Sequence, residues 1–174
     1  MSTNNTIRSI KILKKSGVEI QYVFHDTMTV DGEDFDIPRE RKEKIHADPK
    51  GTFFTAINLM KPHLLALTDM GHAIDAKYLK GRTALEDPRM ERWRVDMVSI
   101  KGDLEDTEIV IHGARVTKRG SQIPFQTIPV KIFNTDFYEF SGNLAEDWAA
   151  LADEAEAILG GNFTPSGQYK LELQ

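Results

Sequence analysis

A hydrophobic period of two recurs along this chain and constrains its fold more than any other feature. Between positions 18 and 24, Val, Ile, Tyr and Phe fill every second position, with mostly polar residues between them. Side chains two residues apart lie on one face of a strand, so such segments predict strands with one buried face. Five segments are predicted as strands on this ground: 7–13, 18–24, 91–100, 107–117 and 123–133.

Turn-forming residues join the predicted strands into antiparallel pairs. The segment 14–17 (Lys-Lys-Ser-Gly) predicts a hairpin of the first two strands, and 101–103 and 118–121 predict a meander of the last three. Proline cannot donate to a central ladder, so Pro124 and Pro129 predict an edge strand or a bulge. Each strand of the meander has one expected hydrophobic face: Trp93, Val95 and Met97; Val110, His112, Ala114 and Val116; Ile128, Val130 and Ile132.

The segment 26–50 is rich in charge and poor in hydrophobic residues. It contains an acidic cluster from Asp31 to Asp36 and a run of Arg, Lys and Glu at 39–44. Without a sustained period this insert predicts a mobile loop, with at most a short helix. The acidic cluster lacks the D-x-[DN]-x-[DN]-G order and the distal glutamate of a calcium loop, so solvated acids are the better explanation.

The helical period appears first in the segment that follows this insert. Asp48 and Pro49 predict a helix start, because aspartate is a frequent N-cap and proline is tolerated at the first helical position. Hydrophobic residues then recur every three or four positions up to Leu67. Pro62 lies inside this run and removes one backbone donor, so a kink or a break into two helices is expected near Lys61.

A second helix is predicted close to the C-terminus. Asn143 is its N-cap candidate, and Gly160 and Gly161 end it before a polar tail of residues 162–174. One hydrophobic stripe marks the face that packs against the rest of the molecule: Leu144, Trp148, Leu151, Ala155 and Ile158.

Together these elements predict one α+β domain, residues 1–161, in the order ββ-α-βββ-α. The expected architecture is an antiparallel sheet of about five strands with two main helices on one face. The length of 174 residues suits a single core. No cysteine is present, and neither a secretory signal nor an apolar stretch of membrane-spanning length is found, so a cytoplasmic location is expected, without membrane association.

The sequence contains no motif of a known catalytic or cofactor site. Phosphate-binding loops, the G-x-S-x-G nucleophile motif and H-E-x-x-H are all missing. His63, Asp69, His72 and Asp75 are the residues closest to metal-ligand spacing, and Asp96 and Glu108 are the carboxylates considered for magnesium. We therefore predict no catalytic residue, no metal and no cofactor; a metal-dependent hydrolase or nuclease stays the alternative.

Basic residues near the predicted turns favour contact with nucleic acid. The net charge of −5 argues against a globally basic binder, so any such contact depends on local clusters. Cations bind phosphates, and aromatic rings stack on the bases of a single strand. The predicted nucleic-acid-binding residues are Lys11, Lys14, Lys15, Arg115, Lys118 and Arg119, with Tyr22 and Trp93 as stacking candidates.

The C-terminal tail offers a different kind of contact. Gln168, Leu171 and Leu173 match the Q-x-x-L-x-L part of the peptide by which bacterial proteins bind the sliding clamp, although Gln174 stands where that motif has an aromatic residue. A tail that is disordered, or that adds a strand to the edge of the sheet, is the other reading.

The order of elements resembles a family of small tailed-bacteriophage and prophage proteins encoded among replication and recombination genes. The likeness rests on the hairpin at 10–22, the helix at 53–67 with its Lys-Pro-His at 61–63, the strand pair at 95–116, and the closing helix at 144–161 followed by a tail. The charged insert at 31–50 departs from that family.

This resemblance implies a setting in viral DNA metabolism. We expect a non-enzymatic accessory protein of DNA replication or recombination that binds single-stranded DNA or a replication protein such as the sliding clamp. A protein-interaction module, for example an inhibitor of a host factor that uses the acidic face at 31–36 or the terminal peptide, is the alternative function. A homodimer formed through exposed sheet edges is a further expectation.

Overall fold

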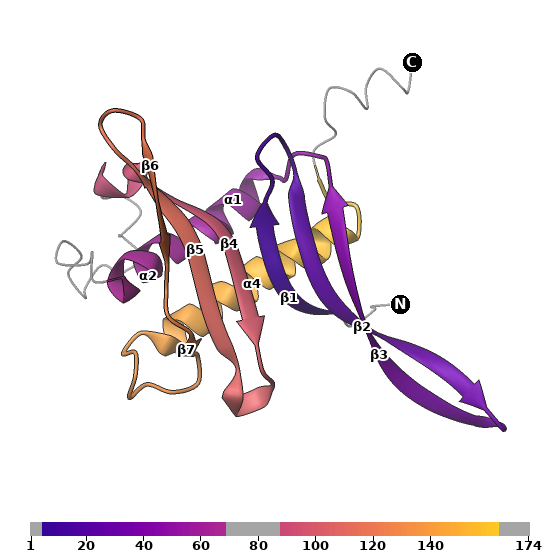
Figure 1. Cartoon of the computed structure of the whole chain (residues 1–174). Coiled ribbons are helices and arrows are strands. Elements are labelled where there is room, and N and C mark those ends of the chain that lie inside the picture. The colour runs from indigo at the N-terminus through magenta and orange to yellow at the C-terminus, as the bar shows by residue number, and fades with distance from the viewer. Residues whose placement is uncertain (1–4, 69–87, 164–174) are drawn as a thin grey trace, which may run out of the picture.

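The computed structural model describes residues 5–68 and 88–163, which form one antiparallel sheet covered by helices on one side (Figure 1). The strand order is β3-β2-β1-β4-β5-β6, and β7 also pairs with β5. Every strand pair is antiparallel. The strands are β1 (Thr6–Ile12), β2 (Val18–Val30), β3 (Glu33–Ile45), β4 (Trp93–Lys101), β5 (Glu108–Val116), β6 (Gln122–Gln126) and β7 (Val130–Lys131).

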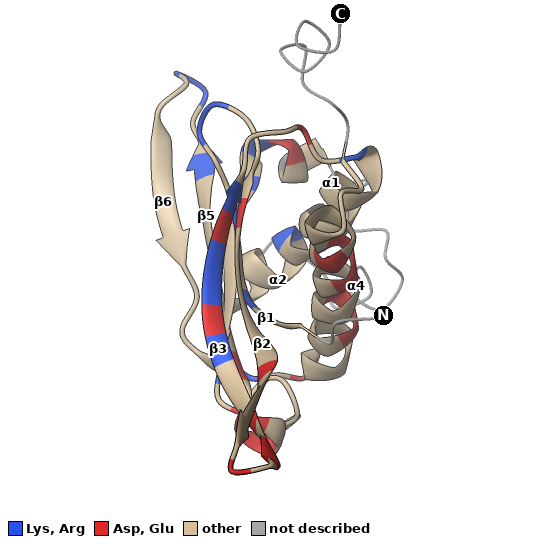
Figure 2. Cartoon of the chain, turned by 90° about the vertical axis from the view of Figure 1, so that its right-hand side faces the viewer, with Lys and Arg blue, Asp and Glu red and all other residues tan. Residues whose placement is uncertain are grey.

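The helices gather behind one face of the sheet, as Figure 2 shows from the side. The predicted hydrophobic stripe of the last helix is confirmed, because all five of its residues are buried in the core. The predicted α+β class with helices on one face is confirmed as well. The helices are α1 (Gly51–Asn58), α2 (Met60–Leu67) and α4 (Ser141–Leu159), with short 3-10 turns η3 (Pro88–Arg92) and η4 (Leu104–Asp106).

The predicted break in the first helix is confirmed, and its two parts meet at Leu59. Pro62 lies in the first turn of α2, where a missing N–H is tolerated. The predicted caps were wrong. Asp48 instead accepts a hydrogen bond from the Ser16 hydroxyl at 2.6 Å, and α1 begins at Gly51. Likewise α4 begins at Ser141, ahead of the proposed cap Asn143.

The prediction of a mobile loop at 26–50 was wrong, because most of this segment is strand. β2 continues to Val30, and β3 returns along it with paired residues from Val30 opposite Glu33 to Val18 opposite Ile45. Asp31 and Gly32 connect the two strands with φ angles of 55° and 82°. Such positive angles at both central residues suit an Asp-Gly hairpin turn, which matches the twist of the strands.

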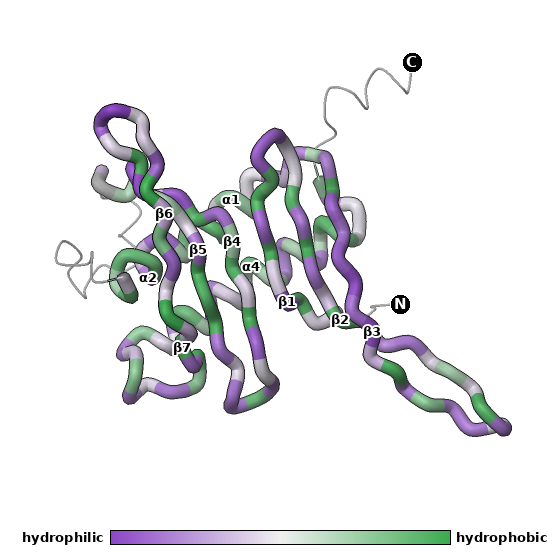
Figure 3. The backbone as a smooth tube through the Cα atoms, in the orientation of Figure 1, coloured by the Kyte–Doolittle hydropathy of each residue, from purple (hydrophilic) through white to green (hydrophobic). Residues whose placement is uncertain are grey.

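Beyond His25 this hairpin leaves the sheet as a free two-stranded ribbon, which we name the arm (residues 25–38). Pairing of β1 with β2 ends at Thr6 opposite Val23, so the arm has no third strand. Figure 1 shows it projecting past the end of α4, and Figure 3 shows hydrophobic positions within it and hydrophilic residues at its tip. The arm is therefore a surface element without a helical cover.

Two bulges in neighbouring strands change which side chains enter the core. The register shifts between Ile7 and Ser9 in β1 and between Val95 and Met97 in β4. The side chains of Trp93 and Val95 both point toward the helices, as predicted. After the shift the next buried side chain is that of Val98, and not that of the predicted Met97. On β5 the core residues are Ile109 and Ile111, which lie on the face opposite to the predicted Val110 and His112.

The predicted last strand is split into two short pieces, β6 and β7. Thr127 lies between them, and its backbone N–H and its hydroxyl both bond to the backbone of Ile111. Pro129 follows in this gap, and Pro124 lies in β6 at the end of the sheet order. The expectation of an edge strand is confirmed for Pro124, whereas Pro129 lies in the gap between two strands and not in a bulge.

Candidate nucleic-acid interface

The predicted basic residues converge on one end of the sheet. Figures 1 and 2 place the β1–β2 turn, the start of β4 and the β5–β6 turn at the same end. We call this region the basic end. Its cations are largely exposed and come from three separate elements: Lys11, Lys14 and Lys15 from the first hairpin, Arg94 from β4, and Arg115, Lys118 and Arg119 from the second hairpin.

A cleft of about 570 Å³ opens at the basic end between β1 and β4. These two strands pair only from Ser9 opposite Ser99 to Lys11 opposite Met97, and the bulge in β4 follows directly. Because pairing stops there, the strands separate and leave a gap that no ladder fills. Five of its seven lining residues are polar or charged. The lining comprises Lys11, Ile12, Leu13, Lys14, Arg94, Asp96 and Gln122.

Arg94 is held in a fixed position in this cleft. Its Nε and Nη2 atoms donate to the two carboxylate oxygens of Asp96, and Nη2 also donates to Gln122 Oε1 of β6 at 3.0 Å. The hydrogen bonds with Asp96 raise the pKa of the Arg94 guanidinium, so it stays charged. Its side chain joins β4 to β6, and Lys11 and Lys14 add mobile charge beside it. Arg94 was not among the residues predicted from the sequence.

His112 lies across from Met97 and next to this charged group. Partial burial lowers the pKa of its imidazole, and the negative charge of Asp96 acts in the opposite direction. His112 is therefore uncharged at neutral pH, and the positive charge of the cleft comes from lysine and arginine. Glu108 lies four residues away along β5, opposite Lys101, so it does not share a site with Asp96.

The two predicted stacking residues are not available to a ligand. Tyr22 and Trp93 are each only 6% exposed, because both point to the helical side of the sheet. The Tyr22 hydroxyl donates to Glu43 at 2.7 Å, and the Trp93 ring packs on Phe125 with ring centroids 5.0 Å apart. Their predicted role in stacking bases was wrong; alternation identified strand aromatics without showing which face was covered.

His63 takes part in a buried polar cluster of the helical layer. Its Nδ1 lies 2.8 Å from the Tyr138 hydroxyl, and its Nε2 lies 2.8 Å from a carboxylate oxygen of Asp147. His63 is 1% exposed, so this arrangement cannot reach a substrate. Its considered metal partners Asp69, His72 and Asp75 lie outside the described residues, and no group of three metal-ligating side chains occurs within the described part of the chain.

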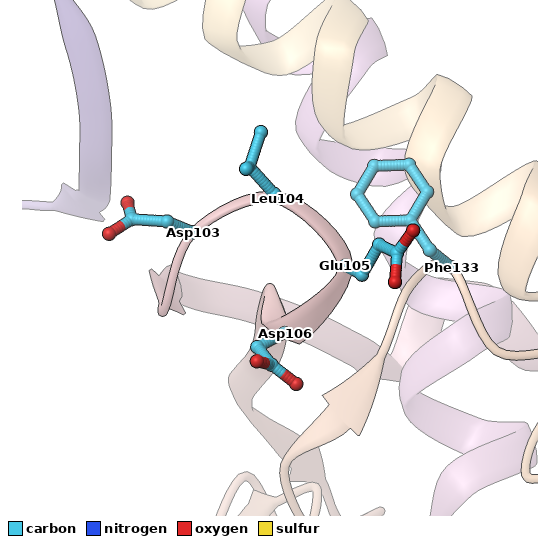
Figure 4. A pocket seen from close by; sticks show the side chains of 5 residues that line it. All are labelled: Asp103, Leu104, Glu105, Asp106 and Phe133. Atoms are coloured by element: carbon cyan, nitrogen blue, oxygen red, sulfur yellow. The ribbon is translucent and has the colours of Figure 1, made fainter.

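Acidic residues occupy the opposite end of the molecule. Figure 2 shows them at the tip of the β2–β3 hairpin and at the β4–β5 turn. At this turn a second cleft of about 550 Å³ is lined by Asp103, Leu104, Glu105, Asp106 and Phe133 (Figure 4). Leu104 is 86% exposed and has a φ of 52°, a strained value for a leucine. Two of the acids are paired, Asp103 with Arg8 and Asp106 with Lys131.

The clamp-like tail residues Gln168, Leu171 and Leu173 lie outside the described residues. In the ranges 5–68 and 88–163, no helix is long and apolar enough to cross a membrane. No family model, curated protein or solved structure matches the chain.

Proposed function

We propose that this protein is a non-enzymatic binding protein whose basic end contacts the sugar-phosphate backbone of single-stranded nucleic acid. The observation that supports it best is the separation of charge along the sheet, with cations from two hairpin turns and β4 at one end. A chain with a net charge of −5 repels a polyanion on average. The separation of charge lets the protein approach nucleic acid with its basic end first, where the attraction is local.

The chemistry of the cleft favours phosphate recognition over base recognition. Arg94 offers a fixed planar donor, and Lys11 and Lys14 supply compact charges on flexible stems. Because Tyr22 and Trp93 are buried, base stacking on these rings contributes nothing. The expected binding is therefore independent of sequence, strongly dependent on salt and of modest affinity.

A setting in bacteriophage DNA replication or recombination fits this function. Single-stranded DNA is exposed during both processes, and a phosphate-binding protein without catalysis can protect it or pass it to a replication protein. The cleft between β1 and β4 is open at the sheet end, so a flexible single strand can follow it from one hairpin turn toward the other.

Fluorescence anisotropy with a labelled single-stranded oligonucleotide tests the proposal. Lys14→Glu and Lys118→Glu, one in each turn, are expected to weaken binding at low salt by several-fold each. Lys101→Glu is the matched control, because Lys101 is an exposed lysine at the acidic end of β4. Absence of salt-sensitive binding by the native chain rules the proposal out, and so does an equal loss with the control variant.

A protein-interaction module is the second candidate, favoured by the exposed apolar side chains at the acidic end. Leu104 and Phe133 both line the cleft of Figure 4, and Phe133 is also largely exposed. Capture of a host protein by the native chain, and its loss with Leu104→Ser, supports a partner at this cleft. A chain ending at Gly161 tests the tail separately; a partner lost only from that chain assigns the contact to the terminal peptide.

A further inference from the structure

One face of the arm is mostly apolar, although Asp26 and Glu33 also lie on it, and the other face is polar. Met28 lies directly opposite Phe35 in the pairing of β2 with β3, and Val30 and Ile37 lie on the same side of the ribbon. The other side is polar: His25 pairs with Asp36 at 3.0 Å, and the Thr29 hydroxyl donates to Asp34 at 2.6 Å. In an amphipathic ribbon of this kind, the apolar face is the one expected to pack against another surface.

Nothing in the described part of the chain covers the apolar face. Met28 and Phe35 are each 49% exposed, and Val30 is 41% exposed. A two-stranded hairpin alone is marginally stable in water, and it gains stability when its apolar face packs against another surface. Within residues 5–68 and 88–163 no segment is available to cover this face, so we look for its occupant on a second copy of the chain.

The charge of the arm specifies what that occupant must carry. Residues 25–38 contain five carboxylates and neither lysine nor arginine. Asp31, Glu33 and Asp34 at the tip form no ion pair with a described residue. The arm therefore fits a surface that combines exposed cations with an exposed apolar side chain.

The basic end of this same chain has both properties. Lys14 and Lys15 are exposed in the β1–β2 turn, and Asp48, three residues before α1, is bonded to Ser16 of that turn. On α1, which begins three residues after Asp48, Phe54 is 41% exposed. The β1–β2 turn thus supplies positive charge in complement to the acidic tip, and α1 supplies an exposed aromatic ring for the apolar strip.

We propose that each arm docks on the β1–β2 turn and α1 of a second copy, which forms a two-fold symmetric dimer. The arm and the basic end lie at opposite ends of one subunit, so a two-fold axis perpendicular to the strands brings both arm contacts together at once. An arm of about seven residues per strand is about 24 Å long. A specific interface buries about 800 Å² per subunit, and in this dimer each subunit contributes both an arm and a docking site to it.

The test is a pair of charge-reversed variants measured by light scattering after size exclusion at low salt. The native chain is expected at twice its 19.7 kDa. Glu33→Lys with Asp34→Lys reverses the arm, and Lys14→Glu with Lys15→Glu reverses the docking site, so each variant alone is expected to be monomeric. An equimolar mixture of the two is expected to dimerise again, because both of its contacts then join opposite charges.

Two further variants complete the experiment. Phe35→Thr is expected to weaken the dimer without a change in charge, and Asp153→Lys on the exposed face of α4 is the control that leaves it intact. The restored mixture also shows that both variants are folded. A monomeric native chain, reversed variants that stay dimeric, or a mixture that stays monomeric would each overturn the proposal. The arm and a nucleic acid would compete for Lys14 and Lys15, so the two contacts are alternatives at this turn. Failure of oligonucleotide binding leaves the dimer result unaffected, since no nucleic acid is present.

Discussion

The side chain of His63 connects α2 with two positions 75 and 84 residues further along the chain. It belongs to α2, whereas Tyr138 precedes α4 and Asp147 lies within α4. Burial and the charge of Asp147 raise the pKa of Tyr138, so its hydroxyl keeps the proton and can donate it to Nδ1 of His63. The remaining ring proton is then on Nε2 and is donated to Asp147. Each buried polar atom of this cluster has a partner, and the cluster positions α4 on α2.

Removal of the Asp147 carboxylate is expected to destabilise the protein. Asp147→Ala leaves the buried Nε2–H without an acceptor and should lower the free energy of unfolding by about 1–3 kcal/mol. Asp147→Asn keeps an acceptor oxygen and should lose less. Urea unfolding followed by circular dichroism measures both; equal losses in the two variants would contradict the hydrogen-bond account.

The imidazole of His112 is expected to titrate below the ordinary histidine range, because partial burial lowers its pKa. A histidine with a depressed pKa takes up its proton more readily in the unfolded chain. Its contribution therefore favours folding at neutral pH and is lost as pH falls from about 6.5 through the folded pKa. Asp96→Asn removes the opposing negative charge and should lower the pKa further. NMR titration of the His112 ring measures its pKa in the native chain and in Asp96→Asn. A higher pKa in Asp96→Asn would refute the opposing effect assigned to the Asp96 charge.

At the scale of elements, α2 packs closely against the sheet at Gly113 of β5. A Cβ atom there would lie 2.2 Å from the carbonyl oxygen of Arg94 and 2.5 Å from Cδ2 of Leu64. Glycine thus allows α2 to rest directly on the sheet. A larger residue must push α2 away or distort β4.

Gly113→Ala is expected to lower the free energy of unfolding by about 1–3 kcal/mol or more through overpacking. Gly142→Ala is the matched control, since the same added atom meets nothing within 4 Å in the first turn of α4. The control should be neutral or slightly stabilising, because alanine favours helix over glycine. Thermal unfolding of the two variants gives the comparison, and an unchanged melting temperature for Gly113→Ala would disprove the close contact.

Most helices and strands were predictable because their hydrophobic periods are regular. The stripe of α4 and the alternation of β2 between Val18 and Tyr22 both point to the core as expected. Bulges defeat this reasoning: one extra residue reverses the pattern, and nothing local marked the shift between Val95 and Met97. The hairpin of β2 and β3 was missed for a different reason. Its Asp31-Gly32 turn is a strong local signal, but the dense charge of the flanking strands hid it.

At the scale of the whole molecule, the separation of charge determines how ligands approach. The basic and acidic ends lie at opposite ends of the strands (Figure 2), so a polyanion is attracted to one end and repelled by the other. The sequence identified six of the cations at the basic end. It could not reveal the cleft, because this depends on where β1 and β4 stop pairing and on the position of Arg94.

Salt dependence measures how many phosphates the basic end contacts. For single strands, the logarithm of the binding constant falls against the logarithm of salt concentration with a slope of about −0.7 per phosphate. Lys118→Ala and Arg119→Ala should each reduce the magnitude of this slope by about 0.7, equally for different base sequences. A loss of affinity with an unchanged slope would exclude direct phosphate contact by these two side chains.

The two outer strands of the sheet determine whether the protein can assemble into fibres. An unprotected outer strand offers free N–H and C=O groups on which further chains can stack, as in amyloid. Here β6 contains Pro124, and the outer strand β3 contains Pro38 followed by alternating charges that include Lys42 and Lys44. Neither outer strand can pair repeatedly with strands of further copies. The protein should therefore resist fibril growth even at high concentration.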